Sequence, residues 1–265
     1  MTFKVNPKTN GSGILAAIPQ KGTCPNECSD CFFQSGRSYL EPLDENLPNL
    51  PTLEQVDDFR IVRVNDGNDS LVKKTEVLKT TKKYPRRFYN TAIPRELSNH
   101  RKGLPFDGEK TAKELESLLE PVVVTINPAE MTDTAFYLMN PIPKNLMFVR
   151  IRTNTWNLEN VVDKAIEHYT KNEVPVILTF MAYYSDSVPK GHEDNYMFRK
   201  RTLNSYSAIT TDAWEKIMDR HKYNMFVYSC GKIEGEKGKT SCSRCGNCAR
   251  EYLNTKEKLS PLKVE

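Results

Sequence analysis

The sequence has 265 residues, 38% hydrophobic and 27% charged, which fits a globular chain large enough to bury a sizeable core. Its 38 basic and 34 acidic side chains leave a net charge of +4, too small a surplus to indicate nucleic-acid binding on electrostatic grounds. No apolar run approaches the roughly 20 residues that a membrane span requires, and the N-terminal residues lack the apolar core of a secretory signal. We therefore expect a cytoplasmic protein with no membrane partner.

Short runs rich in Val, Ile, Phe and Tyr alternate along the chain with longer, charged stretches that have helical apolar spacing. The predicted strands are residues 14–18, 59–64, 87–92, 122–126, 147–152, 174–181 and 225–228. The predicted helices are residues 71–83, 110–119, 131–139, 158–171 and 212–222, with Asn157 and Thr211 as helix starts.

Alternating strands and helices predict an α/β fold, a parallel sheet with helices outside, here a partial, TIM-like (β/α)6 barrel. Residues 1–223 would form this barrel, and residues 224–265 would form a small C-terminal cysteine-rich extension. In such barrels the functional side chains lie just after the carboxyl ends of the strands.

The first of two cysteine groups is Cys24, Cys28 and Cys31, with the spacing C-x3-C-x2-C soon after the first predicted strand. Three thiolates on one tight loop can hold a four-iron, four-sulfur (4Fe-4S) cluster and leave one iron open to a substrate or cofactor. Zinc is the alternative metal, but a structural zinc site needs four protein ligands, and no histidine lies near this loop.

The second group is Cys230, Cys242, Cys245 and Cys248, with the spacing C-x11-C-x2-C-x2-C. Four thiolates close a metal site, and the repeated x2 spacing is similar to that of ferredoxin cluster loops. We predict a second 4Fe-4S cluster here, with structural zinc as the alternative. Together the two groups use all seven cysteines as ligands, whereas an odd number of thiols argues against a disulfide framework.

The spacing of the first group, early in a chain of βα units, resembles the radical S-adenosylmethionine superfamily. This resemblance implies a radical S-adenosylmethionine enzyme, in which the open iron binds S-adenosylmethionine and one electron splits it into methionine and a 5′-deoxyadenosyl radical. The radical would abstract hydrogen from a substrate, and an electron donor such as a flavodoxin or ferredoxin would be a partner. A closed second cluster favours net oxidation, hence oxidoreductase chemistry, and we expect a small-molecule or nucleotide-like substrate.

The same resemblance implies further residues that bind S-adenosylmethionine. In the family, an acidic, glycine-containing turn after the second strand meets the amino group of S-adenosylmethionine, and an ordinary strand-to-helix turn is the alternative. At that place stand Asn65, Asp66, Gly67, Asn68 and Asp69. Thr125 and Asn127 end the fourth strand, where the family places a polar side chain for the ribose or carboxylate. Arg150 and Arg152 end the fifth strand and share a face, where a guanidinium needs an anionic partner such as the carboxylate of methionine.

No residue is assigned a catalytic role from the sequence. Thr179 and Met181 would lie beside adenine, with core packing as the alternative. Tyr183 and His192 could donate a hydrogen atom or a proton, and Trp156 could stack on a planar substrate, with a solvated loop as the alternative.

Three other functions stay open at this point: a two-cluster electron carrier, a zinc-stabilised binding module, and a radical S-adenosylmethionine enzyme that modifies a peptide or protein and binds structural zinc.

Overall fold

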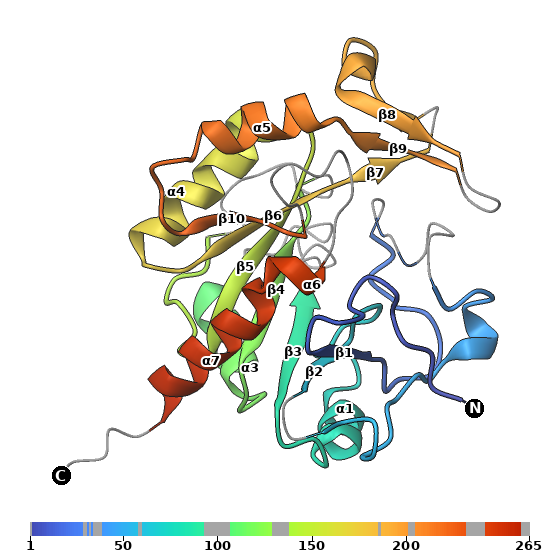
Figure 1. Cartoon of the computed structure of the whole chain (residues 1–265). Helices are drawn as coiled ribbons and strands as arrows, with labels where there is room; N and C mark the ends of the chain where they lie inside the picture. The colour runs from blue at the N-terminus through green and yellow to red at the C-terminus, as the bar shows by residue number, and fades with distance from the viewer. Residues whose placement is uncertain are drawn as a thin grey trace.

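The computed structural model describes residues 2–28, 31, 33, 39–57, 60–92, 107–128, 138–184, 187–200, 205–231 and 242–260. Its central feature is a parallel sheet of seven strands in the order β1-β2-β3-β4-β5-β6-β10, curled into an open half-barrel (Figure 1). The strands are Ile14–Ala17, Ile61–Val64, Arg87–Ala92, Val122–Ile126, Leu146–Thr153, Val176–Phe180 and Val227–Ser229. The predicted α/β fold with an open parallel barrel is confirmed.

Helices between the strands cover the convex face of the half-barrel and bury the larger apolar core against it. They are α1 (Lys74–Thr81), α3 (Gly108–Glu116), α4 (Asp163–Lys171), which follows the π-helical turn η4 (Leu158–Val162), and α5 (Thr211–Asp219). Two further short helical turns are η1 (Asp44–Asn46) and η6 (Glu193–Asn195). The cap of α5 is Thr210, whose side chain accepts from the Ala213 amide, one residue before the predicted start at Thr211. The helix predicted at residues 131–139 falls mostly outside the described residues.

The concave face of the half-barrel is covered by the last described helix, α7 (Asn247–Leu259), which follows the short helix α6 (Cys242–Cys245). Tyr252 of α7 is 2% exposed, and its ring centroid lies 6.4 Å from that of Phe88 on β3. The C-terminal segment therefore packs on the sheet, and the predicted small C-terminal cysteine-rich extension stays a prediction. A domain boundary between residues 223 and 224 stays a prediction.

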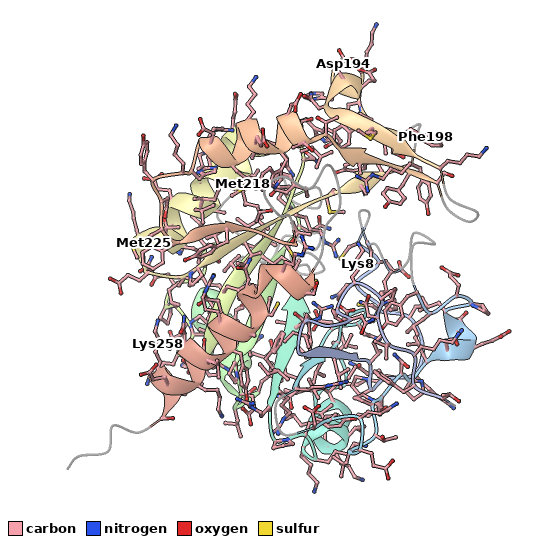
Figure 2. All side chains as sticks on the ribbon, viewed as in Figure 1. Lys8, Asp194, Phe198, Met218, Met225 and Lys258 are labelled. Carbon is pink, nitrogen blue, oxygen red and sulfur yellow. The ribbon has the colours of Figure 1, made fainter. Side chains whose placement is uncertain are left out.

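A small antiparallel sheet lies beyond the carboxyl end of β6, with the order β7-β9-β8 (Figure 1). Its strands are β7 (Ala182–Tyr183), β8 (Tyr196–Arg199) and β9 (Tyr206–Ile209). Phe198 on β8 is 56% exposed, so this sheet presents apolar surface to solvent (Figure 2). The sequence analysis missed it because strands of two and four residues leave too little periodicity to detect.

Across the described residues, none of the helices combines the length and the apolar character that crossing a membrane requires.

Replacing Tyr252 with Ala should lower the free energy of unfolding by about 3 kcal/mol, because the ring fills the floor of the concave face. The neighbouring Leu253 is 51% exposed, so Leu253→Ala should change it by no more than about 0.5 kcal/mol. Urea denaturation followed by circular dichroism measures both. Equal losses for the two variants would show that α7 does not pack on the sheet through Tyr252.

Candidate functional site

The three-cysteine loop, which carries Cys24, Cys28 and Cys31, follows β1 at the carboxyl edge of the sheet. The amide of Cys31 donates to the Cys28 carbonyl at 3.0 Å, which closes a tight turn. The pKa of the Cys24 thiol is raised to about 12, mainly by burial and also by the nearby Asp69, Cys28 and Cys31, against an opposing backbone hydrogen bond from Asn26. The structure thus brings the three predicted ligands together.

Asp69 fastens this loop to the sheet. Its side chain is buried, and its carboxylate accepts from the Leu71 amide (2.9 Å), the Thr91 hydroxyl (2.8 Å), the Ala92 amide (2.9 Å) and Nδ2 of Asn26 (3.1 Å). Asn26 lies between the first two cysteines, and Thr91 and Ala92 end β3. Asp69 belongs to the turn that was predicted to meet S-adenosylmethionine, and its carboxylate accepts hydrogen bonds from four protein groups. These bonds position the cysteine loop.

The other residues of the turn after β2 also make protein contacts. Asn65 has a φ of 64° and donates from Nδ2 to the Ser70 hydroxyl at 3.0 Å, and Asn68 donates to the Gly22 carbonyl at 3.3 Å. Asp66 pairs with Arg63 at 2.5 Å and accepts from Nδ2 of Asn6 at 2.6 Å.

Gly67 makes the close approach that the sequence predicted, but to a protein side chain. A Cβ at this position would lie 2.2 Å from Cζ of Phe33, two residues after Cys31. The absence of a side chain at Gly67 therefore makes room for the ring that follows the cysteine loop, while the predicted contact of its backbone with a ligand stays a prediction.

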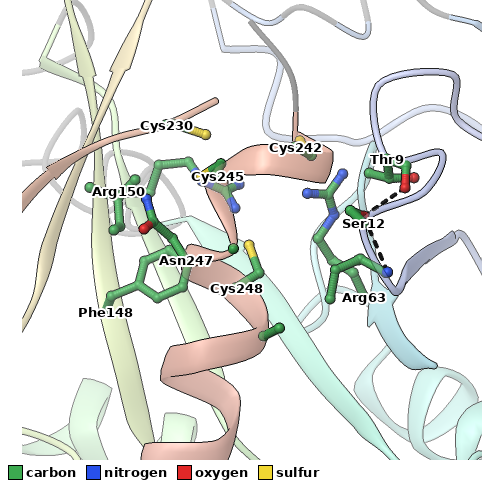
Figure 3. A pocket seen from close by; sticks show the side chains of 14 residues that line it. Thr9, Ser12, Arg63, Phe148, Arg150, Cys230, Cys242, Cys245, Asn247 and Cys248 are labelled. Atoms are coloured by element: carbon green, nitrogen blue, oxygen red, sulfur yellow. Dashed lines mark hydrogen bonds between the residues drawn. The ribbon is translucent and has the colours of Figure 1, made fainter. Parts of the chain in front are cut away.

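Cys230, Cys242, Cys245 and Cys248 line one pocket, the four-cysteine pocket (Figure 3). Cys230 follows β10, Cys242 and Cys245 lie on α6, and Cys248 is in the first turn of α7. The empty space of the pocket is about 450 Å³, part of it open to solvent. Nδ2 of Asn247 donates to the Ser229 carbonyl at 3.0 Å and so joins α7 to the end of β10.

Two arginines reach into the four-cysteine pocket from the sheet: Arg63 of β2 and Arg150 of β5 (Figure 3). The pKa of Cys242 is raised to about 12, mainly by burial and also by Cys230, while Arg63 opposes the rise. Burial also raises the pKa of Cys248, which Arg63 and Arg150 both oppose. The pocket therefore gathers four thiols beside two guanidinium groups. The sequence analysis missed Arg63, although a single arginine in the apolar run Ile-Val-Arg-Val was a usable signal.

Within the part of the chain that the structure describes, no group of three or more His, Cys, Asp or Glu side chains is arranged to hold a metal ion. A tetrahedral zinc site needs sulfur atoms about 2.3 Å from one point. Here the four thiols line one pocket, but the described residues contain no metal-binding group that is already formed, and whether these cysteines hold a cluster or zinc stays a prediction.

Five polar side chains form the concave row on β4, the residue after it, β5 and β6: Thr125, Asn127, Arg150, Arg152 and Thr179. Thr125 pairs in register with Arg150, and Arg152 with Thr179. On β5 the concave core contains Phe148 and the convex core contains Val149 and Ile151, so both arginines project from the concave face, as predicted.

Several buried atoms of the concave row have no hydrogen-bond partner among the described residues. They are Nδ2 and Oδ1 of Asn127, Nε of Arg150, Nη1 of Arg152 and Oγ1 of Thr179. An unsatisfied buried polar group costs about 1–3 kcal/mol, so a set of them on one face makes the concave row a candidate site for a polar ligand.

The other sequence candidates are engaged with one another or buried in the core. The ring of Trp156 lies 4.9 Å from that of Tyr183 and 5.4 Å from that of His192, between centroids. Nδ1 of His192 is 2.9 Å from the Thr155 hydroxyl. Met181 is 1% exposed, which matches the core alternative.

Comparisons with known proteins give one similarity. No family model matches the chain, and no curated protein matches it. Among solved structures, the crystal structure of the spore cortex-lytic enzyme SleL of Bacillus megaterium matches with a TM-score of 0.41 and 11% identity. The match covers 96% of this chain and 71% of that one. At this similarity neither fold nor activity is carried over from that enzyme.

The comparisons give no support to the predicted function. The matched protein is named as a cortex-lytic enzyme, and none of the comparisons supports reductive S-adenosylmethionine cleavage, hydrogen abstraction or oxidoreductase chemistry. These reactions are withdrawn. The resemblance of the cysteine spacing to the superfamily and the binding of S-adenosylmethionine are not tested by any comparison and stay predictions.

The contact between Gly67 and Phe33 predicts a non-additive pair of substitutions. Gly67→Ala should destabilise the protein by about 1–3 kcal/mol, because the added methyl group overlaps the ring. In a Phe33→Ala background the same change should cost at least about 0.5 kcal/mol less, since the space is then empty. Chemical denaturation of the four proteins in the cycle gives the interaction energy. Strictly additive losses would contradict the packing described.

Proposed function

We propose that this chain is an enzyme that carries iron–sulfur clusters on its two cysteine groups and binds a small anionic ligand on the concave face of its half-barrel. The observation that carries the proposal is the four-cysteine pocket with Arg63 and Arg150 inside it. In this proposal the half-barrel is a TIM-like (β/α)6 unit, and α6 and α7 close its cofactor pocket.

The donor set of the four-cysteine pocket suits a polynuclear cluster. Four cysteine thiolates are the usual ligands of a closed 4Fe-4S cluster, and sulfur atoms spaced around a pocket suit a cluster better than one ion. Burial favours the protonated thiols of Cys242 and Cys248, whereas coordination to a metal deprotonates cysteine ligands. The thiolate-ligated group is then anionic, and Arg150, together with Arg63, which also pairs with Asp66, supplies countercharge that a buried anion needs.

The three-cysteine loop offers three thiols, so a 4Fe-4S cluster held there has one iron without a protein ligand. When bound, such a cluster supplies an electron and an open coordination site. The loop itself contributes position, because Asp69 joins it through Asn26 to the end of β3. This tie keeps the thiols at the carboxyl edge of the sheet, beside the concave face.

The concave row recognises the ligand. Guanidinium groups of Arg150 and Arg152 pair with a carboxylate or phosphate, and the unpaired amide of Asn127 can donate and accept at one hydroxyl or amide group. S-adenosylmethionine carries a carboxylate and two ribose hydroxyls and is one ligand of this chemistry. A small-molecule or nucleotide-like substrate and an electron donor such as a flavodoxin or ferredoxin remain part of the proposal as partners.

Iron analysis tests the cofactor assignment. Protein purified without oxygen should contain iron and acid-labile sulfide, and the Cys24, Cys28, Cys31 triple alanine variant should retain about four irons per chain in the four-cysteine pocket. Adding Cys245→Ala to the triple variant should remove this iron, because no closed ligand set is left. Wild-type protein that holds zinc without iron, or no metal, would refute the proposal.

Ligand titration tests the concave row. Arg152→Ala should weaken binding of S-adenosylmethionine and of L-methionine about tenfold or more, because a charge-assisted pair to the carboxylate is lost. The matched control is Arg60→Ala, since Arg60 is 47% exposed and pairs with Asp57 at the surface. Calorimetry measures both affinities. Unchanged affinity in Arg152→Ala would place the anionic ligand elsewhere.

A further inference from the structure

We infer that Arg63 sets the reduction potential of the cluster in the four-cysteine pocket. The inference rests on the proposed function, because it needs a cluster at these cysteines. It concerns a residue that the sequence analysis did not select and that lies on the opposite side of the pocket from β10.

Arg63 is placed in the pocket by its strand. It is the third residue of β2, 8% exposed, and projects toward Cys242 and Cys248 in the view of the pocket (Figure 3). Its guanidinium interacts electrostatically with both of these thiols. Arg150 approaches Cys248 from β5, so two positive charges flank the same ligand.

Asp66 holds Arg63 in this orientation. Nη2 of Arg63 lies 2.5 Å from Oδ1 of Asp66, and the other carboxylate oxygen accepts from Nδ2 of Asn6 at 2.6 Å. Nε of Arg63 is buried and has no hydrogen-bond partner among the residues described. The guanidinium is therefore fixed at one end, and an unsatisfied N–H remains at the other.

A fixed positive charge in a buried site changes the energy of electron uptake. Reduction adds one electron to a group that is already anionic and forms or breaks no bond. A guanidinium stays protonated at any working pH and stabilises the more negative, reduced state, so it raises the potential. Charge and hydrogen bonds around cluster sulfur are the established means by which a protein tunes this quantity.

The test is a redox titration with dithionite in the Cys24, Cys28, Cys31 triple alanine background, where a single cluster is present. Arg63→Met should lower the midpoint potential by at least about 59 mV, which for one electron is a tenfold shift of the equilibrium toward the oxidised cluster at a fixed potential. Arg63→Lys keeps the charge and should lower the midpoint potential less. Arg60→Met, which removes an exposed charge three residues earlier, is the matched control and should leave the midpoint unchanged.

Iron content and thermal unfolding of each variant separate an electrostatic effect from loss of the site. If Arg63→Met does not retain the cluster, Arg63→Gln, which removes the same charge and keeps a polar side chain, is titrated in its place. Equal midpoints for the Arg63→Met, Arg63→Lys and Arg60→Met proteins, with full iron content, overturn the inference and leave the proposed function intact. A wild-type protein without iron overturns the proposed function itself.

Discussion

The candidate site depends on the hydrogen bonds that the buried carboxylate of Asp69 accepts. It accepts four hydrogen bonds from three different segments: the turn after β2, the end of β3 and the three-cysteine loop. A buried charge is tolerated when it is fully hydrogen-bonded, and removing any of its partners leaves the others uncompensated. The position of the cysteine loop is thus coupled to the register of the sheet below it.

The same balance of charge and burial governs the four-cysteine pocket. Arg63 and Arg150 lie within the wall of the half-barrel beside four thiols, and burial disfavours the thiolate of Cys242 and Cys248. Asp66 already pairs with Arg63, and an anionic, thiolate-ligated group would supply a partner for Arg150. The unsatisfied atoms of the concave row extend this polar zone along the sheet toward Thr179.

Sequence periodicity predicted the sheet well, because fully buried parallel strands are continuous apolar runs; residues 87–92 and 122–126 match β3 and β4 residue for residue. It missed α7, since the cysteines before this helix favoured a metal loop. It predicted ligand contacts for Asp69 and Gly67 but not their contacts with Asn26 and Phe33, because turn residues look alike whatever their partner. These contacts join segments that lie far apart in the chain, and the spacing of residues in the sequence does not encode them. The cysteine groups were found because ligand spacing is local.

The position of the last cysteine on α7 has a consequence for the order of events during synthesis. The three-cysteine loop and its anchors are complete once the chain has passed Ala92, well before the sheet is finished. The four-cysteine pocket takes walls from Arg63 and Arg150 but its last cysteine from Cys248, followed one helical turn later by Tyr252. The three-cysteine loop can therefore form early during synthesis. The four-cysteine pocket can form only after α7 has been made.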